Sequence, residues 1–130
     1  LQVMPEIIST PNALVQTTNG KRFYVYSSTV TVTATETTMI SIDNIGERDI
    51  FLKFQIGSLK ASSIDTDLKV YSNDIIIYQT VILASGVEYI NDVGRYEFIL
   101  PSNSKLQITL ENTSGSDSSP WTVAGHGKYV

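Results

Sequence analysis

Apolar and polar residues alternate with a period of two along much of the chain from Phe23 onward. In IFLKFQI (50–56) every second residue is apolar, and Lys53 and Gln55 fall between them. This period is typical of a strand with one face in the core. It also predicts a strand over TVTVTAT (29–35), with the valines and the alanine on one face. Residues expected to share inward faces are Ile50, Leu52, Phe54 and Ile56; Tyr96, Phe98 and Leu100; Leu106, Ile108 and Leu110; and Trp121, Val123 and Tyr129.

Small polar residues that tolerate positive φ angles separate these segments, at 43–46, 72–74 and 91–94. Ser72-Asn73-Asp74 predicts a hairpin. The run Ile75-Ile76-Ile77-Tyr78 that follows is apolar on both faces, so its register stays open. The run predicts a central strand or a strand covered on both sides.

The loop PSNS (101–104) allows a test of strand pairing. A direct hairpin would place Leu100 opposite Lys105 and Phe98 opposite Gln107, which mixes the core face with the solvent face. Either the loop is one residue longer or shorter, or the chain crosses here between two sheets.

The composition agrees with strands, because 15 Ile, 11 Val and 14 Thr stand against 5 Ala. Branching at Cβ restricts rotamers in a helix but suits a pleated sheet. Eight or nine short strands with regular turn signals predict an all-β fold. We expect a two-sheet antiparallel sandwich, jelly-roll-like, with an extended N-terminal arm.

Residues 1–22 differ from the rest, because Pro5 and Pro11 remove backbone donors and interrupt any regular ladder. The apolar pairs Ile7-Ile8 and Leu14-Val15 lie beside these prolines. We interpret 1–22 as an extended arm that packs on another surface rather than a free tail, and 23–130 as a single β-sandwich domain.

The charge and cysteine content exclude several function classes. The net charge is −4 with no run of basic residues, so neither nucleic acid nor a membrane surface is an expected partner. Apolar runs are too short to span a bilayer, and no leader peptide is visible. Absence of cysteine excludes disulfides, thiolate metal sites and cysteine nucleophiles.

Candidate catalytic and metal sites are weak. His126 is the only histidine, so neither a two-histidine metal site nor a catalytic triad that needs a second histidine is available. Asp65 and Asp67 have the spacing of alternate cation ligands but lack the further oxygens of a calcium loop. Carboxylate pairs for glycoside hydrolysis would have to come from Glu88, Asp92, Glu97 and Glu111, which strand edges explain equally well. We expect no enzyme, no cofactor and no metal.

Aromatic residues offer the remaining candidates for binding. Tyr24, Tyr26, Tyr71, Tyr78 and Trp121 could form a sugar-stacking platform or an oligomer interface, or lie at the boundary of the core. Asn112-Thr113-Ser114 fits the N-glycosylation pattern, which we attribute to chance. The candidate partner or oligomer contacts are Ile7, Ile8, Leu14, Val15, Tyr24, Tyr26 and Trp121.

Two stretches, 36–57 and 100–130, resemble small β-sandwich virion proteins of tailed bacteriophages. The second stretch carries a segment of the type P-x-N/T-S/T-K-L-x-I-x-L-x-N, a polar loop and a closing strand that ends in Gly-Lys-Tyr. The matching residues are Pro101, Ser104, Lys105, Leu106, Ile108, Leu110, Asn112, Gly127, Lys128 and Tyr129.

This resemblance implies a non-enzymatic virion structural protein, a head decoration or cement subunit that stabilises the capsid through its arm and sandwich surface. Implied partners are the major capsid protein or other virion proteins, in a homo-oligomer for which a trimer is the first choice. The implied location is the virion, assembled in the host cytoplasm. The alternative is a carbohydrate- or receptor-binding jelly-roll module of a tail component.

Overall fold

The computed structural model describes residues 6–7, 13–18, 22–58, 65–82, 90–113 and 119–130. In these ranges the chain forms strands and no helix, and thus no helix that could cross a membrane. The strands are β1 (Glu6–Ile7), β2 (Ala13–Thr18), β3 (Arg22–Ser27), β4 (Val30–Val32), β5 (Thr37–Asn44), β6 (Ile50–Ser58), β7 (Thr66–Ser72), β8 (Ile75–Ile82), β9 (Ile90–Leu100), β10 (Leu106–Asn112) and β11 (Ser119–Tyr129).

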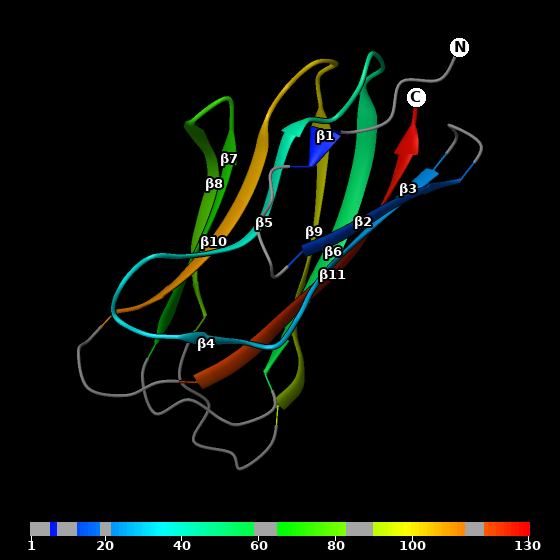
Figure 1. Ribbon diagram of the computed structural model, residues 1–130. Helices are drawn as coiled ribbons and strands as arrows, with labels where there is room; N and C mark the ends of the chain where they lie inside the picture. Colours follow the sequence, from blue (N-terminus) through cyan, green and yellow to red (C-terminus); the bar gives the residue numbers. More distant parts are fainter. Residues whose placement is uncertain (1–5, 8–12, 19–21, 59–64, 83–89, 114–118) are drawn as a thin grey trace.

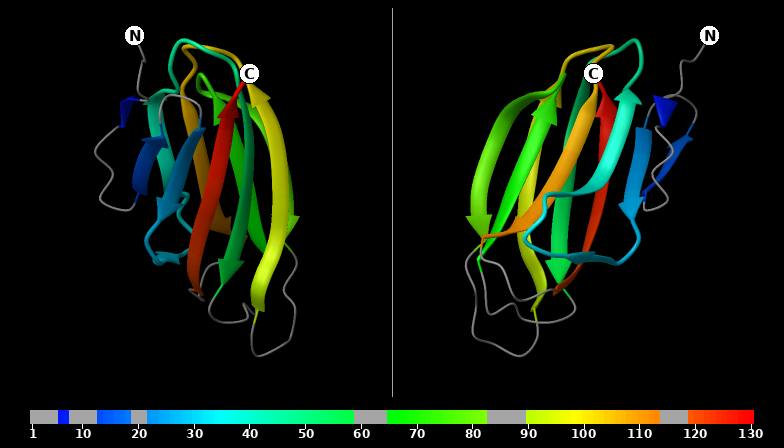
Figure 2. Two further views of the ribbon diagram at one scale, coloured as in Figure 1. Left: turned by 90° about the vertical axis from the view of Figure 1, so that its right-hand side faces the viewer. Right: turned by 60° about the vertical axis from the view of Figure 1, so that its left-hand side comes forward.

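The strands form two antiparallel sheets, so the predicted sandwich is confirmed (Figure 1). Sheet I has the order β1-β5-β10-β7-β8, and sheet II has the order β2-β3-β11-β6-β9, with β4 also paired to β11. Figure 2 shows sheet II in its left view and sheet I in its right view.

The long strands pair in a nested order that defines a jelly roll. The innermost pair is β7 with β8, and around it lie β6 with β9, β5 with β10 and β3 with β11. Successive pairs alternate between sheet I and sheet II. A hairpin that folds over in this way produces the two four-stranded layers of a jelly roll.

The core lies between the two sheets, where the alternation of the sequence placed it. Ile50, Leu52, Phe54 and Ile56 of β6 are buried, while Lys53 on the same strand is exposed. The inward residues of β10 and β11 are buried as well, and Tyr96 and Phe98 of β9 pack against the core. The predicted inward faces of these four strands are therefore confirmed.

The PSNS loop crosses from one sheet to the other, which was the second of the two alternatives. Leu100 ends β9 in sheet II, and Leu106 begins β10 in sheet I. Ser104 Oγ donates a hydrogen bond of 2.7 Å to the Pro101 carbonyl oxygen, and Asn103 adopts a positive φ of 58°. The register conflict of a direct hairpin thus does not arise.

The strand predicted over 29–35 is shorter than expected, because the chain leaves sheet II after Val32. Buried Asn112 of β10 holds the departing segment: its side-chain Nδ2 donates to the Val32 carbonyl oxygen at 3.1 Å, and its backbone N to Thr33 at 2.8 Å. The Thr66 hydroxyl donates to Asn112 Oδ1 at 3.0 Å. With 2% exposure and these bonds, Asn112 is inaccessible as a glycosylation acceptor in the folded chain.

The predicted hairpin at 72–74 is confirmed, but the prediction for the strand after it is wrong. Asn73 and Asp74 have φ angles of 51° and 65°, as a two-residue type I′ turn requires. The next strand, β8, is an edge strand of sheet I rather than a central one, and the exposure of Ile75, Ile76 and Ile77, between 42% and 67%, shows that it is not covered on both sides. Continuous apolar runs carry no information that separates these two positions.

Within the segment 1–22, the described residues belong to strands. Glu6 and Ile7 pair with β5, and Ala13–Thr18 pairs with six residues of β3 at the edge of sheet II. The boundary at residue 22 between an arm and the sandwich domain stays a prediction.

Candidate functional site

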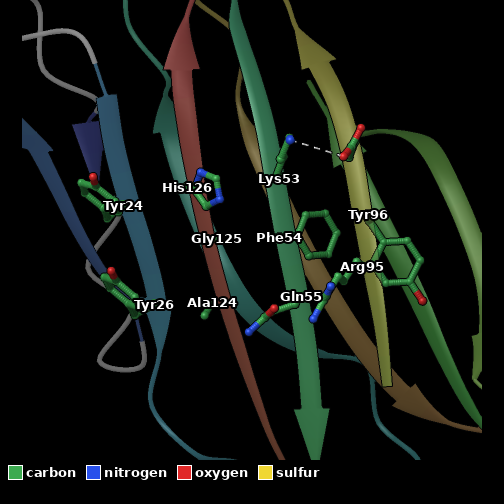
Figure 3. A pocket seen from close by; sticks show the side chains of 11 residues that line it. Tyr24, Tyr26, Lys53, Phe54, Gln55, Arg95, Tyr96, Ala124, Gly125 and His126 are labelled. Carbon is green, nitrogen blue, oxygen red and sulfur yellow. Dashed lines mark ion pairs between the residues drawn. The ribbon is translucent and has the colours of Figure 1, made fainter. Parts of the chain in front are cut away.

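A shallow concavity lies on the outer face of sheet II, where four strands contribute neighbouring side chains (Figure 3). One row across the sheet pairs Tyr24 with His126, His126 with Lys53, and Lys53 with Glu97. The adjacent row runs from Tyr26 through Ala124 and Gln55 to Arg95. These two rows line a shallow groove of about 510 Å³, which we call the tyrosine groove.

Positive charge gathers on this face. Lys53 and Arg95 line the groove itself, while Arg22 and Lys128 line an adjoining hollow of about 280 Å³ that shares Lys53 and His126. Among the side chains described on this face, Glu97 is the only carboxylate. It lies 3.6 Å from Lys53 Nζ, and both side chains are more than half exposed, so water screens this pair.

The outer face of sheet I has the opposite charge. Glu36 lies between β4 and β5, where its Oε2 accepts hydrogen bonds of 2.6 Å from the Tyr71 and Thr109 hydroxyls. Glu111 of this sheet lies 3.9 Å from Lys69, and register places Asp67 opposite Glu111. The two outer faces of the sandwich are therefore chemically distinct.

The hydrogen bonds around Glu36 change the acidity of both partners. Donation by Thr109 and then by Tyr71 lowers the pKa of Glu36 below 4.5, with burial opposing and the charge of Lys69 assisting. The same contact raises the pKa of Tyr71 to about 12, because ionised Tyr71 could no longer donate to the carboxylate.

A third surface is formed by β8. Ile75, Ile76, Ile77, Tyr78 and Val81 are between 37% and 67% exposed, and we call these five residues the apolar edge. Tyr78 also closes the open side of the sandwich, with its ring 5.6 Å from Tyr96 and 5.4 Å from Phe98 of β9. Both β9 rings in turn contact Phe54 in the core.

The structure places the residues predicted as partner contacts in different environments. Tyr24 and Tyr26 lie side by side on β3 and line the tyrosine groove. Trp121 is 1% exposed and belongs to the core, so it is not the surface contact that we expected. It alternates in phase with Val123 and Tyr129, and this side of the strand faces the core.

The arm residues give less information. Ile8 lies outside the described residues. Ile7, Leu14 and Val15 belong to β1 and β2 by their backbone pairing, and their side chains are outside the description.

The carboxylates considered for glycoside hydrolysis are not brought together. Glu97 and Glu111 lie on the outer faces of different sheets, where each pairs with a lysine. Glu88 and the side chain of Asp92 lie outside the described residues. Within the described ranges, no three metal-ligating side chains converge.

No protein-family model matches the sequence, and neither does any curated protein. Among solved structures, the insecticidal delta-endotoxin Cry8Ea1 from Bacillus thuringiensis is similar, with 15% identity and a TM-score of 0.51 over 80% of this chain and 20% of the toxin chain. This chain thus spans about a fifth of that toxin. At this identity, the likeness shows the fold alone.

Two further solved structures have lower scores. A protein of Bacillus endospore appendages, which form disulfide-linked pili, has 15% identity and a TM-score of 0.47, with 90% of this chain and 98% of that chain covered. The VP2 subviral particle of infectious bursal disease virus has 12% identity and a TM-score of 0.34, with 88% and 30% covered.

Sequence reasoning missed the basic character of the groove. The four cations of this face, at positions 22, 53, 95 and 128, come from four different strands and are far apart in the chain. The sequence did indicate two of the groove residues, because the alternation over 50–56 predicts that Lys53 and Gln55 face solvent. Strand order and register were needed to add the other residues.

Proposed function

We propose that this chain is a non-enzymatic structural protein of a bacteriophage virion, and specifically a head decoration or cement subunit. It binds the capsid by protein–protein contacts, with the major capsid protein or other virion proteins as partners. It acts as a homo-oligomer, with a trimer as the expected state, and is located in the virion after assembly in the host cytoplasm.

The apolar edge is the observation that carries this proposal. Soluble proteins protect exposed edge strands with charged residues, prolines or bulges, because an unprotected edge pairs with other chains. The register shift opposite Val70 and Tyr71 leaves one extra residue, Ile77, in β8, so this edge strand has a bulge, but it carries no charge and no proline. Five partly exposed apolar side chains on such a strand are typical of a surface that a partner covers.

A partner strand added along β8 would complete the backbone hydrogen bonding of this edge and would cover its exposed apolar side chains. Its backbone would pair with the outer N–H and C=O groups of β8, and its side chains would cover the isoleucines on both faces. Sheet I would then continue into the neighbouring molecule, a contact that can be repeated around a capsid.

The resemblance of 36–57 and 100–130 to phage virion proteins supports the assignment to a phage. Jelly rolls also occur in viral capsid proteins, although the same fold hosts unrelated functions. The fold therefore does not separate a structural role from other roles, and the support for a structural role comes from the exposed apolar surface of β8.

Attachment to particles tests this proposal. Purified protein is mixed with virus particles from which it has been removed, and the bound fraction is measured by sedimentation. We expect Val81→Lys to weaken attachment about tenfold or more, because removing the ammonium group of a lysine from water in the contact costs on the order of 2 kcal/mol or more, even beside Asp67 on the paired strand.

Val130→Lys is the matched control, since Val130 lies after β11 and is 72% exposed against 46% for Val81. This control should attach like the unmodified protein. Failure of the unmodified protein to attach at all would contradict the virion role. Equal attachment of the Val81→Lys variant would contradict a contact through the apolar edge.

A further inference from the structure

The tyrosine groove combines two kinds of chemistry that meet on one surface. Tyr24 and Tyr26 stand two residues apart on β3, about 7 Å from each other along the strand, and offer ring faces and hydroxyls. Facing them across the groove are Lys53 and Arg95, with the Gln55 amide and the His126 ring between (Figure 3). Such a set can contact the ring of a sugar at one end and an acidic substituent at the other.

The charge of this face narrows the class of ligand. Four cations and a single described carboxylate make it basic within a protein of net charge −4. Arginine recognises carboxylate, sulfate and phosphate through paired hydrogen bonds, and lysine adds a point charge. An acidic ligand would balance this excess of positive charge over the described carboxylate, whereas a neutral sugar would not.

The size and shape of the groove agree with a small ligand. Its volume of about 510 Å³ falls within the usual range for small-molecule sites. It lies on the outer surface of the sheet, so a sugar chain can reach its lining residues from solvent.

We propose that the tyrosine groove binds an oligosaccharide that carries acidic groups, as uronic acids, sulfated sugars and phosphorylated sugars do. Tyr24 and Tyr26 pack against the sugar rings, while Lys53 and Arg95 pair with the acidic groups. This inference goes beyond the structural role and is independent of it, because it uses a different face of the sandwich from the apolar edge.

Calorimetric titration of the purified full chain tests the proposal. The probes are an oligogalacturonate, which carries carboxylates, and a heparin-derived oligosaccharide, which adds sulfates. Maltohexaose is the neutral control, and a short oligothymidylate is an anionic control without exposed pyranose rings. We expect at least one acidic sugar to bind, with an affinity that falls as salt rises, and weaker or no binding of both controls.

Variants then locate the site. Lys53→Gln combined with Arg95→Gln should weaken binding of the acidic sugar about tenfold or more, and Tyr26→Ala should weaken it as well. Lys69→Gln is the control, because it removes one positive charge, against two in the double variant, from the outer face of sheet I. It should bind like the unmodified chain.

Four results would overturn the inference. The first is no binding of either acidic sugar. The second is binding that the groove variants leave unchanged. The third is oligothymidylate binding as tight as sugar binding. The fourth is self-association, measured by sedimentation, that the groove variants abolish while sugar binding is absent, which would assign the basic face to the acidic face of a second copy. All four leave particle attachment through the apolar edge untouched.

Discussion

Gly125 lies on the core face of β11, opposite Phe54 of β6. A Cβ at this position would lie 2.9 Å from Phe54 Cβ and 3.0 Å from the Lys53 carbonyl oxygen, both closer than ordinary contacts. One of these atoms belongs to the backbone of a central strand, which has little room to move. The absence of a side chain at 125 therefore lets Phe54 occupy this part of the core.

We predict that Gly125→Ala lowers the free energy of unfolding by about 1–3 kcal/mol, because an added methyl group in a close-packed core forces neighbours apart. Chemical denaturation followed by fluorescence of buried Trp121 measures this change. Gln55→Ala, on the outer face of the same pair of strands, should have a smaller effect. Unchanged stability of the Gly125→Ala variant would show that β6 and β11 can separate freely here.

Alternation in the sequence predicted which residues face the core, but not what each inward residue contributes. Trp121 was in phase with Val123 and Tyr129, and its burial follows from that phase. Its role as a partner contact was inferred from residue type alone and was wrong. Asn112 is likewise inward by phase, yet its bonds to Thr66 and Val32 required the three-dimensional arrangement.

At the scale of elements, the crossing from β4 to β5 is tied to sheet I by Glu36. This carboxylate accepts hydrogen bonds from Tyr71 of β7 and Thr109 of β10, so one side chain joins three segments. Because the pKa of Glu36 is lowered, the contribution of this carboxylate to stability is present above pH 4.5 and is lost as the pH falls through the lowered pKa.

Glu36→Gln should therefore be less stable than the unmodified chain at neutral pH. The difference should shrink as the pH falls through the lowered pKa of Glu36. Tyr71 gives the opposite pH dependence, because its pKa is raised. Its contribution to stability is complete below pH 10 and is lost as the pH rises through about 12. Unfolding measured across pH for Glu36→Gln and Tyr71→Phe checks both arms, and a difference constant with pH would contradict this account.

The strand β8 shows where sequence patterns fail at this scale. Strands with alternating residues, such as β6 and β10, were placed with the correct face inward, because one side is polar. In β8 the apolar run has no polar side, and it predicted a central strand or a strand covered on both sides. A partner that covers β8 in an assembly produces the same sequence pattern as a central position.

At the scale of the whole molecule, the distribution of charge says more about possible contacts than the net charge does. The net charge is −4, but the outer face of sheet II is basic and the outer face of sheet I carries Glu36, Asp67 and Glu111. The jelly-roll topology creates this separation, because strands distant in sequence become neighbours within each sheet. Fold class and core were predictable from local alternation, whereas both proposed contact surfaces depend on strand order.

The central claim, a structural role in the virion, is tested most directly by counting copies of the chain in purified particles. Quantitative mass spectrometry gives the ratio of this chain to the major capsid protein. The account predicts a ratio that matches the repeating sites of the capsid lattice. Absence of the chain from the particles, or a few copies per particle as in a tail or vertex component, would contradict it.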